Sequence, residues 1–135
     1  MDIVIENLSK SYGKTQVLRD VSVSAKGGNC IGIIGANGSG KSTLLSVLAG
    51  VLERDDGTFL FDGEDLFQNR KKRSDLVGYV PQGIPLIEEL TCRDNLLLWY
   101  DRIQLKKELE SGILKLLGID AFIKMPVRKL SGGMI

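Results

Sequence analysis

A chain of 135 residues is the size of one ordinary domain and can bury a substantial hydrophobic core. Its hydrophobic content of 43% and charged content of 26% are typical of a soluble globular protein. The net charge of +1 provides no electrostatic reason to expect nucleic acid or an anionic membrane as the main partner. Histidine is absent, which removes the commonest general base and the commonest zinc ligand.

No segment of the sequence predicts a membrane span or a secretory signal. The longest apolar run, Leu44–Leu52, is far too short to cross a bilayer. A function at a membrane would therefore require spanning helices from another chain. The cysteines, Cys30 and Cys92, lack metal-ligand spacing. We therefore expect a reducing cytosol as the compartment.

The N-terminal region is predicted to form an antiparallel hairpin. Ile3–Ile5 alternates weakly and indicates a strand, and Gln16–Ser24 indicates a second, antiparallel strand. Leu18 is out of phase with the other apolar residues of that strand, so we expect a bend or bulge there. Tyr12 falls in the turn between the strands, where packing on the hairpin is its simplest role.

Residues 35–42 match the phosphate-loop pattern G-x-x-x-x-G-K-[ST] at every fixed position. Cys30–Ile34 before it is predicted to be a short buried strand, and Ser42–Leu52 after it a buried helix. Small residues let backbone N–H groups turn inward around an anion, and the helix dipole points at the same place. The alternative, a glycine-rich surface turn, does not account for the strand before and the helix after. We predict a nucleoside triphosphate site formed by Gly35, Ala36, Asn37, Gly38, Ser39, Gly40, Lys41, Ser42 and Thr43.

Short strands and turns are predicted to follow the loop helix. Thr58–Phe61 indicates a strand that ends at an Asp62-Gly63 turn. The basic run Arg70–Arg73 favours the solvated face of a short helix over a nucleic-acid patch. Val77–Val80 indicates another strand, which Pro81 ends, leaving Gln82 in a loop.

The hydrophobic period becomes helical in the last third of the chain. Thr91–Asp94 is similar to a capping box, and the apolar spacing of Leu105–Leu117 predicts a helix that Gly118 would cap. No linker separates this part from the rest. We therefore expect two subdomains of one unit, residues 1–88 with the β subdomain and phosphate-loop core, and residues 89–135 with the helical subdomain.

The order of these motifs resembles one protein family. Tyr12, the phosphate loop, Tyr79-Val80-Pro81-Gln82, a helical block and Leu130-Ser131-Gly132-Gly133 follow one another as in the nucleotide-binding domain of ATP-binding cassette (ABC) transporters. The resemblance covers the whole chain, and its Leu-Ser-Gly-Gly signature is highly specific. It implies an α/β phosphate-loop NTPase fold of the ABC type, with an antiparallel β subdomain, an α/β core and a helical subdomain.

The resemblance also implies roles for individual residues. Tyr12 corresponds to the aromatic residue that stacks on adenine, Lys41 to the lysine on the β- and γ-phosphates, and Ser42 to a Mg²⁺ ligand. Gln82 corresponds to the glutamine that contacts Mg²⁺ and the attacking water, so Lys41 and Gln82 are the implied catalytic residues. Ser131, Gly132 and Gly133 correspond to the signature, which contacts the γ-phosphate of ATP held by the other protomer.

The implied cofactors and partners follow from the same family. ATP and Mg²⁺ are the cofactors, a second cassette closes head to tail over two ATP molecules, and an integral-membrane transporter subunit is the other partner. No nucleic acid is expected. The location is cytoplasmic, on the inner face of the cell membrane through that subunit. Met134 replaces the usual Gln after the signature, a feature common among bacterial exporters.

The family's metal-holding Asp, catalytic Glu and switch His follow the signature, and the chain of 135 residues contains no match to them. Asp101 and Asp62 each follow an apolar run, but Asp101 is expected on a helix surface and Asp62 in a hairpin turn. We interpret both as decoys. The chain is therefore expected to be the N-terminal portion of a longer ATPase, truncated before the Walker B strand, with marginal stability and doubtful turnover of its own.

Three other functions remain open from the residues. One is an ATP-binding fragment without hydrolysis, which the missing catalytic strand favours. Another is a non-transport ABC protein acting on ribosomes or DNA, although such proteins usually carry insertions or paired cassettes. An unrelated phosphate-loop kinase is more distant, because it would not account for Leu130–Gly133.

Overall fold

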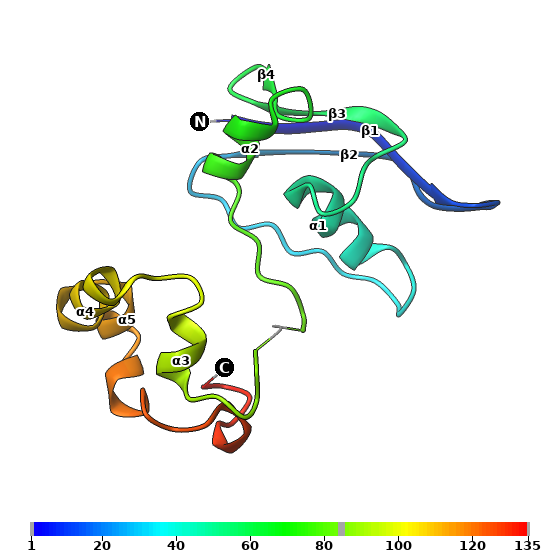
Figure 1. The fold of residues 1–135 in the computed structure, drawn as a ribbon. Coiled ribbons are helices and arrows are strands. Elements are labelled where there is room, and N and C mark those ends of the chain that lie inside the picture. Colours follow the sequence, from blue (N-terminus) through cyan, green and yellow to red (C-terminus); the bar gives the residue numbers. More distant parts are fainter. Residues whose placement is uncertain (1, 84–85, 135) are drawn as a thin grey trace. The chain divides into compact units, whose positions relative to one another are not determined.

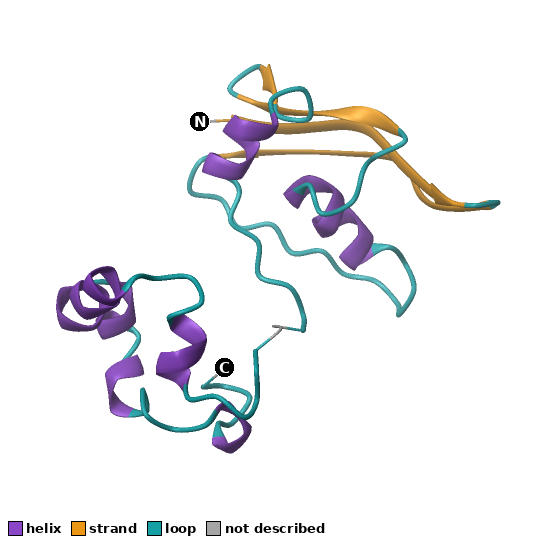
Figure 2. Cartoon of the chain, in the orientation of Figure 1, coloured by secondary structure: helices purple, strands orange, loops and turns teal. Residues whose placement is uncertain are grey.

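The computed structural model describes residues 2–83 and 86–134. These residues divide into two compact units, with the division between Tyr79 and Val80. The first unit contains all the labelled strands together with helices α1 and α2, and the second contains helices and loops (Figures 1 and 2). The subdomain boundary expected between residues 88 and 89 stays a prediction.

A four-stranded antiparallel sheet forms the framework of the first unit. Its strands are β1 (Asp2–Tyr12), β2 (Thr15–Lys26), β3 (Asp56–Phe61) and β4 (Glu64–Asp65), in the order β2-β1-β3-β4. The predicted N-terminal hairpin and the predicted strand after the loop helix are both confirmed. β1 extends further than its weak alternation indicated, because β2 and β3 both pair with it.

The long hairpin is irregular where the sequence alternation fails. Pairing shifts between Leu8↔Val21 and Lys10↔Leu18, which confirms the bend expected near Leu18. Asp20, inside the irregular stretch, has φ 46°, a left-handed conformation that Asp tolerates better than most residues. Such bulges increase local twist and re-aim the side chains beyond them. The far end of the hairpin, which carries Tyr12, follows this irregular stretch.

Helix α1 (Lys41–Ala49) packs one face against this sheet. Leu44 and Val47 are buried in one core with Ile5, Leu8 and Phe59 of the sheet. The buried helix predicted over Ser42–Leu52 is confirmed on this face only: the helix ends at Ala49, and Leu45 is 46% exposed. The helix has one sheet to pack on within the described residues, so its opposite apolar face remains open.

Two predicted strands are absent from the structure. Cys30–Ile34 and Val77–Val80 run as loops, and Ile34 and Val80 are 97% and 80% exposed. A β-strand requires a hydrogen-bonded neighbour, and neither segment pairs with β1–β4. Their apolar composition fits a parallel sheet, but within the described residues no strand lies beside either of them. The parallel part of the predicted α/β core is therefore not formed by residues 2–83 and 86–134.

The Asp62-Gly63 turn and the basic helix follow the prediction. The turn joins β3 to β4, and helix α2 (Arg70–Leu76) carries the basic run with no buried residue. The guanidinium carbons of Arg54 and Arg73 lie 4.3 and 5.7 Å from the centre of the Phe67 ring. These cation–π contacts give Arg73 of the basic run, and Arg54 earlier in the chain, a packing role.

The second unit consists of short helices. They are α3 (Cys92–Leu96), α4 (Arg102–Ser111), α5 (Ile113–Leu116) and the 3₁₀ turns η1 (Ile119–Ala121) and η2 (Val127–Lys129). Thr91 caps α3 as predicted, since its hydroxyl accepts a hydrogen bond from the Asp94 N–H at 3.1 Å.

The single helix predicted over Leu105–Leu117 is wrong, because the structure breaks it at Gly112. The Glu108 carboxylate accepts the Ile113 N–H at 2.9 Å and so begins α5. Gly118, with φ 70°, takes the left-handed conformation expected of the predicted cap. Across both units, none of the described helices is long and apolar enough to cross a bilayer.

Candidate functional site: the phosphate loop

The phosphate loop is an exposed turn that runs directly into α1. The Ser39 N–H donates to the Ala36 carbonyl at 3.2 Å, which closes the turn around Asn37 and Gly38. Gly38 and Gly40 have φ values of 80° and 92°, which residues with a Cβ rarely adopt. Glycine is therefore required at both positions to bring the backbone around to the helix.

Lys41, the first residue of α1, folds back over this turn. Its Nζ donates to the carbonyl oxygens of Gly35 at 2.8 Å and Ala36 at 2.7 Å. An ammonium group has three donors, so one remains beyond these two bonds. The carbonyls thus hold the cation at the mouth of the loop, where an anion can replace them as its partner.

The start of α1 supplies further donors. The first intrahelical bond is donated by the Leu44 N–H to the Gly40 carbonyl at 2.8 Å, so the N–H groups of Lys41, Ser42 and Thr43 precede the helical ladder. The first turn contains no acidic side chain. Free N–H groups, the positive end of the helix dipole and the Lys41 ammonium together form an environment that favours a phosphate group.

The loop fits closely against the hairpin at Gly40. A Cβ at this position would lie 3.0 Å from Val17 Cγ1 and 3.1 Å from the Val17 carbonyl oxygen. A Cβ at Gly35 would lie 2.6 Å from the Ser39 hydroxyl. The backbone path therefore depends on small residues at both ends of the loop, as predicted from the pattern.

Tyr12 is the last residue of β1 rather than part of the turn in which the sequence placed it. It pairs with Thr15 at the end of the hairpin and is 48% exposed. Lys10 Nζ lies 6.0 Å from the centre of the Tyr12 ring and 2.8 Å from Asp55 Oδ1. The Lys10 ammonium thus lies over the Tyr12 ring, and about half of the residue's surface remains exposed to solvent.

The remaining predicted site residues belong to the second unit. Gln82 is exposed, and Ser131, Gly132 and Gly133 are exposed in a turn closed by the Met134 N–H and the Ser131 carbonyl at 2.9 Å. The structure thus gathers residues 35–43 into one loop, and Tyr12 belongs to the same unit. Joint action of these residues with Gln82 or the signature stays a prediction.

Both carboxylates interpreted as decoys have structural partners. Asp101 caps α4 by accepting the N–H groups of Ile103 and Gln104, each at 2.8 Å, and Gln104 completes a capping box. Asp62 Oδ1 accepts the Asp2 N–H at 2.6 Å, and this bond is the main cause of its lowered pKa. No group of three or more His, Cys, Asp and Glu residues suited to a metal occurs among the described residues.

One contact near the loop has no counterpart in the sequence analysis. The Ser46 hydroxyl on α1 and the Tyr79 hydroxyl are 3.2 Å apart and partly buried. This bond joins the phosphate-loop helix to the segment that leads toward Gln82. No local pattern signals it, because its partners are 33 residues apart.

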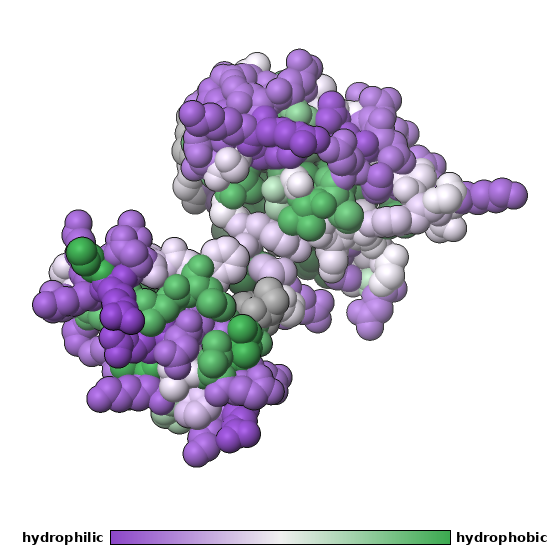
Figure 3. Space-filling view, viewed as in Figure 1, coloured by the Kyte–Doolittle hydropathy of each residue, from purple (hydrophilic) through white to green (hydrophobic). Residues whose placement is uncertain are grey.

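The first unit also contains an apolar groove, and none of residues 35–43 lines it. This groove of about 650 Å³ is lined by sheet, α1 and loop residues such as Ile5, Ile33 and Leu48. Figure 3 shows hydrophobic side chains on the surface of this unit, bordered by hydrophilic ones. Lys41 does not line it. Residues of Cys30–Ile34 and Val77–Val80 belong to this lining, as expected of apolar segments without a neighbouring strand among the described residues.

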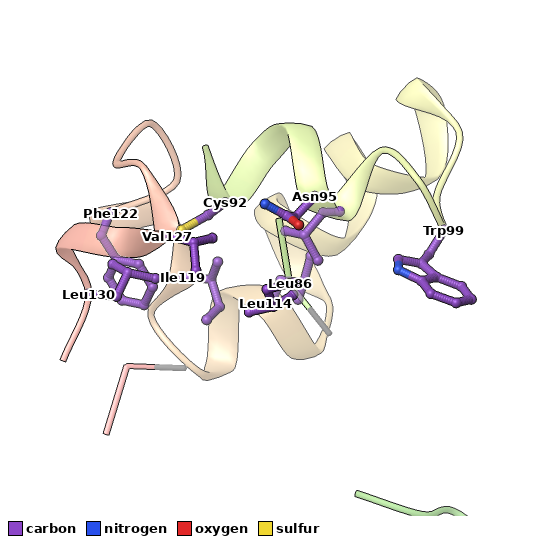
Figure 4. Close-up of a pocket in the computed structure, with 10 residues that line it drawn as sticks. Leu86, Cys92, Asn95, Trp99, Leu114, Ile119, Phe122, Val127 and Leu130 are labelled. Atoms are coloured by element: carbon purple, nitrogen blue, oxygen red, sulfur yellow. The ribbon is translucent and has the colours of Figure 1, made fainter. Parts of the chain in front are cut away.

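A smaller cavity of about 170 Å³ lies in the second unit (Figure 4). The Asn95 amide on its wall is satisfied, with bonds to the Ile87 N–H and to the Ile87 and Thr91 carbonyls. Burial raises the pKa of the Cys92 thiol, which keeps it protonated and unreactive. In Figure 4 the Trp99 ring lies at the outer end of the lining, and this side chain is 81% exposed. Among the described residues, its lining is apolar apart from the Asn95 amide, the Cys92 thiol and the Trp99 indole N–H.

Comparisons with known proteins agree with the loop geometry. The sequence model of the family described as ABC transporter matches residues 18–135. The chain is 33% identical over 133 residues to the Linearmycin resistance ATP-binding protein LnrL of Bacillus subtilis (strain 168), covering 96% of this chain and 43% of LnrL. It is 38% identical over 137 residues to the Probable sulfate/thiosulfate import ATP-binding protein CysA of Chlorella vulgaris, covering 98% of this chain and 58% of that protein.

Solved structures give the same result. A nucleotide-free ATP-binding cassette from an ABC transporter superposes with a TM-score of 0.72 at 28% identity, covering 98% of this chain and 60% of that one. An ATP-binding subunit of an ABC transporter gives a TM-score of 0.72 at 25% identity, covering 99% and 57%. The chain thus spans roughly half the length of these relatives. The family match, the relatives and the loop together establish that this chain belongs to the ABC transporter family, within its ATP-binding domain.

Proposed function

We propose that this chain binds Mg²⁺-ATP at residues 35–43 and serves a membrane transporter as part of its ATP-binding subunit. The position of Lys41 carries the proposal, because its ammonium lies at the loop mouth on the carbonyls of Gly35 and Ala36. The charge and the donor groups of these residues fit a triphosphate. Small residues leave the backbone open, and N–H groups at the start of α1 face no competing carboxylate of the first turn.

Each loop residue has a definite part in this proposal. Lys41 would exchange its carbonyl partners for β- and γ-phosphate oxygens, and the backbone N–H groups of the loop and first turn would surround the phosphates. The Ser42 hydroxyl would ligate Mg²⁺. Tyr12 would stack on adenine through its ring face, which its 48% exposure leaves available. Bound Mg²⁺ neutralises charge that develops on the phosphates.

Gln82 and the signature extend the proposal beyond the loop. Gln82 would contact Mg²⁺ and water and couple the site to the membrane subunit. Ser131, Gly132 and Gly133, exposed in their turn, would contact the γ-phosphate of an ATP on a second cassette. ATP hydrolysis, the head-to-tail dimer and the transporter partner are proposals for the whole protein. The transporter partner would hold the protein at the inner face of the cell membrane.

The names of the relatives support the transport part of this proposal. LnrL is named for linearmycin resistance, CysA for sulfate and thiosulfate import, and SrtF for lantibiotic transport. The compounds in these names differ, and of the three names only that of CysA states a direction of transport, import. We therefore propose a solute transporter without assigning a substrate or a direction.

Titration calorimetry with Mg²⁺-ATP on the protein and its Lys41→Ala variant tests the site. A charge-assisted hydrogen bond contributes about 1.5–3 kcal/mol, so the variant is expected to bind on the order of 10- to 100-fold more weakly. Lys14→Ala, in the hairpin turn, is the matched control and should bind normally. Unchanged affinity in Lys41→Ala would overturn the site assignment.

Purification from the native cell after mild detergent extraction tests the partner. We expect a membrane-spanning protein to co-purify with the full-length protein. Salt-sensitive binding of RNA or DNA in its place would favour a ribosome- or DNA-associated ABC protein and contradict the transporter proposal.

A further inference from the structure

A second groove, in the helical unit, combines apolar walls with a basic rim. Its volume is about 400 Å³, which is within the range of small-molecule sites, roughly 300–1,000 Å³. It lies between α3, α4 and the segment after η1, and the Arg93 N–H donates to the Ile123 carbonyl at 2.9 Å beside it. This backbone bond ties the two sides of the groove together.

Apolar side chains form the walls of the groove. Leu105, on its α4 side, is only 2% exposed, and Leu109 follows one helical turn later. Leu97 and Ile123, both half-buried, face the groove from the other elements. An apolar chain placed here would remove the exposed parts of Leu97, Leu109 and Ile123 from water, which is the main source of affinity in such sites.

Cationic groups dominate the rim. Arg93, Arg102, Lys106 and Lys124 line the groove together with one carboxylate, that of Glu110. Glu110 pairs with Lys106 at 3.7 Å, and both side chains are exposed. The side chains of Arg93, Arg102 and Lys124 have no ion-pair or hydrogen-bond partner within the described residues. The rim is therefore positively charged and open to an anion.

We propose that this groove binds a fatty-acid anion, with its alkyl chain along Leu97, Leu105, Leu109 and Ile123 and its carboxylate at the basic rim. The groove is lined by nine of the described residues, which suits a small amphiphile better than a protein partner, because stable protein interfaces use about 20–30 residues on each side. The charge selects an anionic head over a neutral or cationic one. The site belongs to the helical unit and is independent of the phosphate loop.

Isothermal titration of the protein with laurate, below its micelle concentration, tests the proposal. We expect saturable binding of one laurate per chain, weakened by added salt because the rim contacts are exposed. Dodecyltrimethylammonium has the same tail with the opposite head charge and should bind at least tenfold more weakly. Equal binding of the two amphiphiles, or no saturable heat with laurate, would overturn the proposal.

Matched variants locate the site. Lys124→Glu should weaken laurate binding at least tenfold, whereas Lys107→Glu, a neighbouring charge on α4 that does not line the groove, should leave it unchanged. Ile123→Ser should weaken binding, whereas Ile103→Ser, at a position 83% exposed, should not. Far-UV circular dichroism checks that each variant remains helical. Equal loss in a variant and its control would overturn the assignment, as would binding of an acidic amphipathic peptide without laurate binding.

Discussion

The Ser46 hydroxyl on α1 lies 3.2 Å from the hydroxyl of Tyr79, which is the last residue of the first unit. Ser46 lies five residues after Lys41 on the same helix, and Tyr79 precedes Gln82 by three residues in a loop. The bond therefore connects the helix that carries the phosphate-loop lysine to the start of the segment that leads to the predicted catalytic glutamine. Its partly buried position means that its loss leaves a polar group without a partner.

Tyr79→Phe is expected to lower the free energy of unfolding by about 0.5–1.5 kcal/mol, the usual value of one such hydrogen bond. Urea denaturation measures the change. Tyr100→Phe is the matched control, since the Tyr100 hydroxyl makes no hydrogen bond within the described residues. A double-mutant cycle with Ser46→Ala isolates the pair, and strictly additive effects would contradict a direct bond.

Gly40→Ala is expected to destabilise the protein more than Gly38→Ala. Both glycines have positive φ, so alanine costs on the order of 1–2 kcal/mol at either position. At Gly40 the new methyl would also meet Val17 and Leu18 at 3.0–3.1 Å, whereas nothing lies within 4 Å at Gly38. Thermal unfolding of the two variants compares them directly. Equal destabilisation of the two variants would show that Val17 and Leu18 can shift to accommodate the new methyl group at little energetic cost.

Replacing Asp55 is expected to change the pH dependence of stability. The hydrogen bond from Lys10, followed by the one from the Ser11 N–H, holds the pKa of Asp55 below its ordinary value of 3.8. A lowered folded-state pKa contributes stability above the ordinary value and loses it as the pH falls through the folded-state pKa. Asp55→Asn should therefore flatten the loss of stability below about pH 4.

Thermal unfolding at a series of acid pH values measures this slope. Asp75→Asn, at an exposed carboxylate on α2, serves as the control and should retain the slope of the parent protein. The same Asp55 variant should release Lys10, which lies beside the Tyr12 ring. An unchanged acid slope in Asp55→Asn would show that its pKa is not linked to folding.

Asp101→Ala is expected to act on stability and not on nucleotide binding. The side chain caps α4 through two N–H groups, and loss of such a cap costs about 0.5–2 kcal/mol. Helical circular dichroism during urea denaturation and calorimetry with Mg²⁺-ATP separate the two effects. Loss of Mg²⁺-dependent ATP affinity without loss of stability would identify Asp101 as a metal ligand and contradict its role as a cap.

Local patterns determined much of this protein from the sequence alone. The phosphate-loop spacing, the Asp62-Gly63 turn, the Thr91 cap and the left-handed Gly118 each depend on a few consecutive residues, so their chemistry is visible without tertiary contacts. The signature at residues 131–133 identified the family by the same kind of local pattern, and the matching relatives confirm it.

Tertiary structure alone decided which apolar segments became strands. Thr58–Phe61 pairs with β1 and lies in the sheet, whereas Cys30–Ile34 and Val77–Val80 have equally apolar sequences and no strand beside them in the described chain. A strand is stabilised by its neighbour's backbone groups, so its own residues cannot determine it. The Ser46–Tyr79 bond and the basic-rimmed groove likewise join residues from separate elements. The sequence determined the phosphate loop and the family, and only long-range packing decided the sheet and the second groove.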